Sequence, residues 1–143
     1  MAGRAIVVTS WVTVAIFAAV VIPDAVGVHA MDNVAVGVSL ALFLGSLPVW
    51  IYAYGLAVTR TARGDDITVS SLFFLSGSAP AEVKRNLFGA LALCIAIAAA
   101  TLVENPFSVL VPMLPLGLAG LWGARHGVFP KRPAAAQPKG GRR

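Results

Sequence analysis

Charged residues are scarce in this sequence. Asp, Glu, Lys and Arg make up 12% of its 143 residues, whereas hydrophobic residues make up 58%; an ordinary soluble domain has about 25% charged residues. A soluble chain of this length cannot bury so much apolar surface, because much of its side-chain area has to face water. The composition therefore excludes an ordinary soluble domain and indicates an integral membrane protein.

Cysteine and catalytic motifs are also lacking. The single cysteine, Cys94, excludes an internal disulfide and any multi-cysteine metal site, and its apolar neighbours favour a packing role. No glycine-rich loop precedes a phosphate-binding lysine, and no Ser or Cys has a His and an acid at a recognisable spacing. We therefore expect no catalytic residue, no cofactor and no resident metal, and we expect that the protein is not an enzyme.

Four long stretches contain no Asp, Glu, Lys or Arg, and each is long enough to cross a bilayer, which takes about 17 to 25 residues. They predict an all-α, four-helix transmembrane domain over residues 1–129. The expected spans cover about 5–22, 34–58, 86–103 and 107–124, with a long loop over 59–85. Pro112 and Pro115 predict a kink in the fourth span. The basic, low-complexity tail over 130–143 is expected to be disordered.

The N-terminus allows a second interpretation. Arg4, the apolar run after it and the small residues around Ala30 resemble a secretory signal peptide, whose cleavage would leave three spans. The run is longer than the usual core of about 7 to 15 residues, which favours a retained span. Both interpretations give the later spans the same orientation.

The eleven Lys and Arg residues fall on one side of a four-span topology. The two loops on the other side contain only Asp24, Asp32 and Glu104 as charges. Basic residues near span ends stay on the cytoplasmic side. We therefore expect the spans in a bacterial inner membrane, with both termini and the 59–85 loop in the cytoplasm. The basic tail is expected to bind anionic lipid rather than nucleic acid, despite the net charge of +5.

Small residues recur at four-residue spacing, which lets membrane helices approach closely. Gly37, Ala41 and Gly45 share this register in the second span. The third span has Ala92, Ala96 and Ala100, and the fourth has Gly120 and Ala124 with Gly117 and Gly123 nearby. These stripes serve either to pack the four helices together or to bind a second copy or a partner protein.

The long loop contains a short apolar patch, Leu72, Phe73, Phe74 and Leu75. Four apolar residues cannot span a bilayer, but they can lie at its interface. The patch either packs against the chain's own helix ends or forms a docking site for a partner. The polar residues Asp24, His29, Asp32 and Glu104 are too scattered to predict a metal site.

Two segments resemble other proteins: Gly64-Asp65-Asp66 leading to Leu72–Gly77, and Leu121–Pro130. They are similar to uncharacterised small four-span membrane proteins of high-GC actinobacteria. The resemblance implies a bacterial inner membrane, and it implies no activity and no site residue.

These observations favour a non-enzymatic membrane protein, either an accessory or assembly subunit or a homo-oligomer. The alternative is a carrier or small pore for a neutral or lipidic substrate, because no span contains the ionisable residue that ion-coupled transporters usually place in the membrane. An enzyme that uses the acids of the outer loops ranks last.

Overall fold

The computed structural model describes residues 3–131, which form helices and connecting loops without a β-strand. Four helical segments are long and apolar enough to cross a membrane, as the charge-free stretches predict. They are α1 (Arg4–Ala25), α2 (Asp32–Ala62), α4 (Ala81–Ala100), and the 3₁₀ helix η2 (Pro106–Leu110) followed by α5 (Met113–His126). The connections contain the 3₁₀ helix η1 (His29–Met31) and the short helix α3 (Val69–Phe73). The all-α, four-helix prediction is confirmed.

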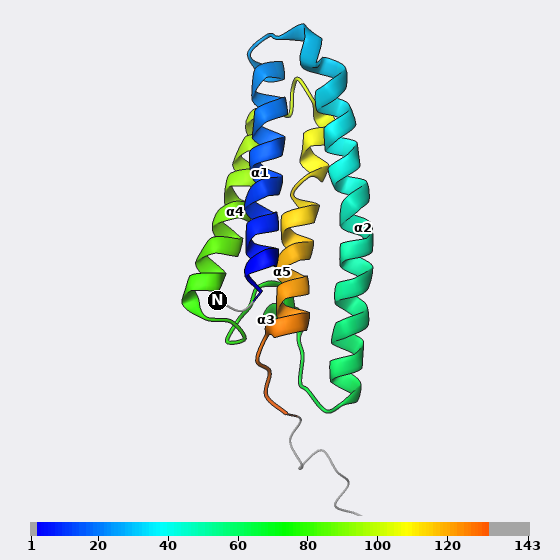
Figure 1. Cartoon of the computed structure of the whole chain (residues 1–143), viewed down its shortest axis with the longest axis vertical. Coiled ribbons are helices and arrows are strands. Elements are labelled where there is room, and N and C mark those ends of the chain that lie inside the picture. The colour runs from blue at the N-terminus through cyan, green and yellow to red at the C-terminus, as the bar shows by residue number, and fades with distance from the viewer. Residues whose placement is uncertain (1–2, 132–143) are drawn as a thin grey trace, which may run out of the picture.

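Helix α5 lies at the centre of the bundle, with α1 and α4 on one side and α2 on the other (Figure 1). Its apolar segment is 61% buried, against 17% for that of α2. Three glycines let neighbours approach α5 closely, because a Cβ on any of them would meet another side chain or backbone. They are Gly117, Gly120 and Gly123. The last span is therefore the core helix of the bundle, and α2 is its most exposed helix.

The two ends of the bundle carry opposite charge. We call the end that holds the 59–85 loop and the last turn of α5 the basic end, and the opposite end, with the loop after α1, the acidic end. The described chain begins and ends at the basic end, where Gly3 lies against Trp122 and His126 (Figure 1). The structure thus places both ends of the described chain on one side, as an even number of spans requires.

The fourth span is broken rather than gently kinked. The Asn105 side chain caps η2 by accepting a hydrogen bond from the Phe107 N–H at 3.2 Å, and Pro106 opens the helix. After Leu110, the 3₁₀ helix gives way to α5, which starts behind Pro112. Proline lacks an N–H, so the interruption follows from the sequence at this position.

The other helix bounds differ from the expected spans by a few residues. α2 continues four residues beyond 58, and α4 starts at Ala81 and ends at Ala100 rather than 103. Proline precedes α4 and Glu82 lies in its first turn, where an acid interacts favourably with the helix dipole. The prediction of a disordered tail lies, beyond Lys131, outside the described residues.

Candidate functional site

One face of α2 is left uncovered by the rest of the chain. Gly37, Ala41 and Gly45 are all exposed, and a Cβ added to either glycine would meet nothing within 4 Å. In a helix that turns 100° per residue, these three positions lie within one arc of about 80° around the helix axis. The exposed Pro48, Tyr52 and Gly55 lie within the same arc. The buried residues of α2 lie on the opposite side: Ala35, Ser39, Ser46, Ala53 and Ala57. α2 therefore has one packed face and one bare face along most of its length.

The other small-residue stripes have different positions. Ala92, Ala96 and Ala100 of α4 are exposed, as the α2 stripe is. The α5 residues Gly120 and Ala124, in contrast, are buried inside the bundle. Of the three stripes, only that of α5 is covered by the described part of the same chain.

The apolar loop patch is divided between core and surface. Leu72, Phe73 and Leu75 are buried, whereas Phe74 is 53% exposed. The Phe73 ring stacks on Trp50 of α2 with 4.6 Å between ring centroids, and it lies over Gly120 of α5. Three of the four patch residues therefore pack against the chain's own helix ends, and Phe74 alone is left to contact a partner.

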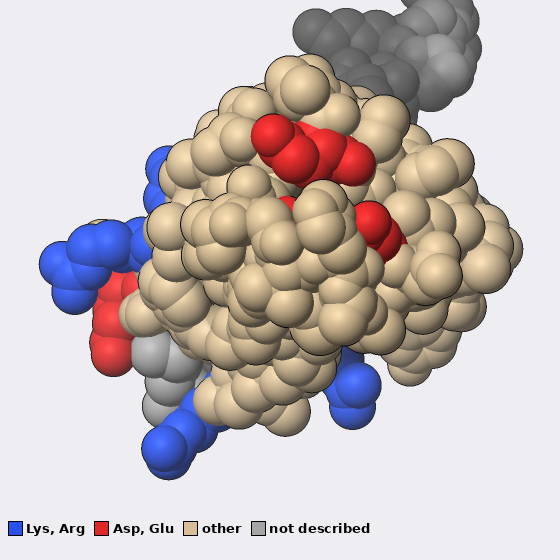
Figure 2. Space-filling model, turned by 90° about the horizontal axis from the view of Figure 1, so that it is seen from above, with Lys and Arg blue, Asp and Glu red and all other residues tan. Residues whose placement is uncertain are grey.

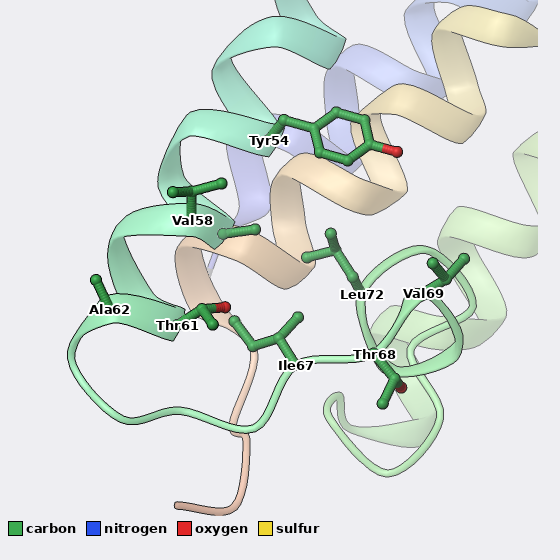
Figure 3. Close-up of a pocket in the computed structure, with 9 residues that line it drawn as sticks. Tyr54, Val58, Thr61, Ala62, Ile67, Thr68, Val69 and Leu72 are labelled. Atoms are coloured by element: carbon green, nitrogen blue, oxygen red, sulfur yellow. The ribbon is translucent and has the colours of Figure 1, made fainter. Parts of the chain in front are cut away.

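A groove of about 440 Å³ runs between the end of α2 and the segment that leads into α3 (Figure 3). Figure 3 shows the side chains of Val58, Ile67 and Leu72 around this space, with the Tyr54 ring at its upper edge. The remaining lining residues are small or polar: Ala57, Thr61, Ala62, Thr68 and Val69. Among the described residues that line it, Tyr54 alone is titratable, so the lining suits an apolar ligand.

An ionic cluster ties the basic ends of α2 and α5 together. The guanidinium of Arg60 donates from Nε to Asp65 at 2.8 Å and from an Nη atom to the Gly127 carbonyl at 2.7 Å. It also lies 4.7 Å from the centre of the Phe129 ring. Lys131 Nζ reaches the other Asp65 oxygen at 2.6 Å. These bonds from Lys131 and Arg60 hold the pKa of the Asp65 carboxyl below its usual value.

The charged groups of this cluster are bonded within the chain. Arg60 and Lys131 pair with Asp65, and Arg60 also donates to the backbone after α5. The backbone adds a bond from the Asp66 N–H to the Pro130 carbonyl at 2.7 Å. The cluster therefore stabilises the packing of α2 against the segment after α5 and is not a ligand site. We call Arg60, Asp65 and Lys131 the clasp. The sequence alone did not reveal it, because Arg60 and Lys131 are far apart along the chain.

The acidic end contains a cleft of about 320 Å³ lined by Asp24, His29, Asp32 and Glu104. Figure 2, which looks down on this end, shows Asp and Glu side chains near its centre. His29 Nδ1 lies 3.7 Å from an Asp32 oxygen. Within residues 3–131, no group of three or more His, Cys, Asp and Glu side chains is placed to hold a metal ion. This cleft therefore supplies no argument for a metal centre.

A buried polar cluster links α2, α4 and η2. Asn105 Nδ2 donates to Ser39 Oγ at 3.0 Å, and Thr101 Oγ1 donates to Ser108 Oγ at 3.3 Å. All four residues are buried. Sequence reasoning missed this cluster; the only signal was that each of these polar residues lies in or beside an apolar stretch.

Comparisons of the chain with protein-family models, with curated proteins and with solved structures gave no match. The function is therefore argued from the geometry alone.

Proposed function

We propose that this chain is a non-enzymatic integral membrane protein that acts by assembly, and that the bare face of α2 binds a transmembrane helix of a second copy or of a partner protein. The observation that carries the proposal is the exposure of Gly37, Ala41 and Gly45 on the least buried span. Helix association in lipid depends on close backbone approach, which small residues permit. The same use of small residues is visible within the chain, where Gly120 lies against Phe73.

The orientation belongs to the same proposal. The protein lies in a bacterial inner membrane with its basic end on the cytoplasmic side, because Lys and Arg near span ends are retained on that side. Arg63, Lys84 and Arg125 lie at this end, whereas the loops of the acidic end contain no Lys or Arg. Phe74, which directly follows α3, is then exposed on the cytoplasmic side, where it is free to contact a partner.

The first experiment compares oligomeric state in mild detergent or nanodiscs. Changing Gly37, Ala41 and Gly45 together to Leu should weaken association at least about tenfold, which is ~1.4 kcal/mol. The matched comparison changes Ala92, Ala96 and Ala100 of α4 to Leu, because these residues are also small, regularly spaced and exposed. If only the α4 triple variant dissociates the complex, the interface is on α4 and the assignment to α2 is wrong.

A second experiment identifies the partner. The tagged chain is extracted from its native membrane, and co-purifying proteins are quantified with their stoichiometry. Phe74→Ser tests the loop contact cleanly, because Phe74 is exposed; Phe73→Ser does not, because Phe73 is a core residue. A monomer without any partner, unchanged by the α2 variant, would refute the proposed assembly role.

A carrier for a neutral or lipidic substrate is the second candidate. The specific observation in its favour is the break between η2 and α5, since discontinuous helices commonly form substrate sites in transporters. Flux of candidate substrates in proteoliposomes, lost when the break is altered by Pro112→Ala, would support it. Flux that is absent, or equal with and without the protein, would count against it.

A further inference from the structure

A second cleft lies between α1 and α4, and no residue of α2 lines it. It has a volume of about 430 Å³ and is bounded by the first turns of α1 and the first turns of α4. From α1 come Arg4, Val7, Val8 and Trp11; from α4 come Glu82 and Asn86. The lining therefore shares no residue with the proposed assembly face of α2.

The cleft is charged at one end and apolar at the other. Arg4 is the first residue of α1 and Glu82 the second of α4, so both charges lie at the basic end. Seven residues further along α1, or about 10 Å at 1.5 Å per residue, lies Trp11. Its indole lies over Gly89 of α4, at 3.6 Å from the position of an added Cβ, and is still 38% exposed.

The two charges at this end are left without an ion-pair partner by residues 3–131. Neither Arg4 nor Glu82 forms an ion pair with another residue of the described chain. The Glu82 carboxylate lies in the first turn of α4, and the side-chain hydrogen bond at this residue goes to its backbone carbonyl, which accepts from Asn86 Nδ2 at 2.9 Å. A cation and an anion that form no ion pair with the described part of the chain thus border one cavity, next to an apolar wall that includes the half-exposed Val8.

We infer that this cleft binds one membrane phospholipid whose headgroup carries a phosphate and a primary ammonium group, with the phosphate at Arg4, the ammonium at Glu82 and an acyl chain along Val8 and Trp11. Arginine presents several N–H donors to phosphate oxygens, and a carboxylate accepts from an ammonium. A purely anionic headgroup would leave Glu82 facing negative charge. A quaternary ammonium could not donate a hydrogen bond to it.

The test uses native mass spectrometry of the full chain in mild detergent, with three added phospholipids that have identical acyl chains. Phosphatidylethanolamine should bind about three- to fivefold more tightly than phosphatidylglycerol or phosphatidylcholine, the size expected for an exposed charge pair. Glu82→Gln should abolish this preference, and Glu82→Asp should retain most of it. Arg4→Gln should weaken binding of all three lipids.

The matched control is Lys84→Gln, which removes a charge at the same end but not from the cleft lining. It should leave the preference unchanged. As a second readout, phosphatidylethanolamine with brominated chains should quench the wild-type fluorescence by more than it quenches Trp11→Phe.

Equal binding of the three lipids, a preference that survives Glu82→Gln, or lipid binding that Arg4→Gln leaves unchanged would each overturn the inference. Loss of the preference in Lys84→Gln as well would show a general charge effect and overturn it too. The far-ultraviolet circular dichroism of each variant checks that it is folded, and Glu82→Asp keeps the test decisive if Glu82→Gln does not fold.

Discussion

The Phe73 ring stacks on the Trp50 indole, with 4.6 Å between the ring centroids and 26° between the planes. On its other side the ring lies so close to Gly120 that an added Cβ there would overlap it. Trp50 is held in turn by a hydrogen bond from its Nε1 to the Met113 carbonyl at 2.9 Å. One aromatic side chain from the loop therefore joins α2 to α5 at the basic end of the bundle.

Changing Phe73 to Ala should destabilise the bundle by about 3–4 kcal/mol, in the lower part of the range for Phe→Ala in a core. The reason is that the ring is 4% exposed and fills the space between two helices. Unfolding followed by circular dichroism during titration with a denaturing detergent measures the change. Phe74→Ala is the control: Phe74 is 53% exposed, and its loss should change stability by less than about 0.5 kcal/mol. Equal effects of the two substitutions would contradict the packing of α3 described here.

Replacing a helical glycine by alanine should have opposite effects on stability at Gly123 and at Gly45. A Cβ on Gly123 would overlap the Leu72 carbonyl oxygen, so Gly123→Ala should push α3 away from α5 and destabilise the fold. A Cβ on Gly45 meets nothing within 4 Å, so Gly45→Ala should be neutral or stabilising by up to about 1 kcal/mol through helix propensity. The same detergent titration compares the two variants. Destabilisation by Gly45→Ala in the monomer would contradict the exposure of that face.

Asp65 should make stability depend on pH in the acid range. Its pKa lies below the usual value of 3.8 because Lys131 and Arg60 hydrogen-bond to the charged carboxylate. The clasp therefore contributes its full stability above pH 3.8, and this contribution is lost as the pH falls through the lower, folded-state pKa. Thermal unfolding between pH 6 and pH 3 should show this loss in the wild type.

Asp65→Asn should be less stable than the wild type at pH 6, and the difference between the two should shrink toward pH 3. Asp66→Asn is the matched control, because Asp66 is the next residue but is exposed and forms no ion pair with the described chain. A difference between wild type and Asp65→Asn that stays constant across this range would show that the clasp is not ionic.

The sequence predicts the four long helices well because the cause is local: an apolar run of this length without charge is typical of a helix that satisfies its own backbone hydrogen bonds. It does not predict which stripes are covered. Gly45 and Gly120 are the same residue type in similar apolar surroundings, yet only Gly120 is packed, because the distant loop residue Phe73 lies on it. Which stripe is covered thus depends on tertiary contacts, and the four-residue spacing of small residues does not predict them.

The loop patch shows the same limit at shorter range. Phe73 and Phe74 are neighbours with opposite burial, because α3 ends at Phe73 and the chain reverses at Leu75, which has a φ of 54°. A non-glycine residue in this conformation is uncommon, and nothing in the local sequence predicts it at Leu75. The patch could be predicted as apolar, but not how its four residues divide between core and surface.

The buried bond between Asn105 and Ser39 provides the last prediction. Ser39 lies in α2 and Asn105 is the N-cap of η2; both are fully buried, and Asn105 Nδ2 donates to Ser39 Oγ at 3.0 Å. Asn105→Ala should destabilise the bundle by about 1–2 kcal/mol, because it leaves Ser39 without this donor and removes the cap of η2. Ser39→Ala should cost less, since Asn105 Oδ1 still caps the Phe107 N–H.

A double-mutant cycle with the two alanine variants separates the bond from the cap. The coupling free energy between the positions should be about 0.6 kcal/mol, and no more than about 1.7 kcal/mol, as for hydrogen bonds between membrane helices. Thr101→Ala serves as a comparison within the same cluster, because Thr101 bonds to Ser108 and not to Ser39; its coupling to Ser39→Ala should be near zero. A coupling with Asn105 that is also near zero would mean that this bond does not hold α2 to the turn before η2. Apolar contacts would then stabilise the part of α2 near the acidic end of the bundle.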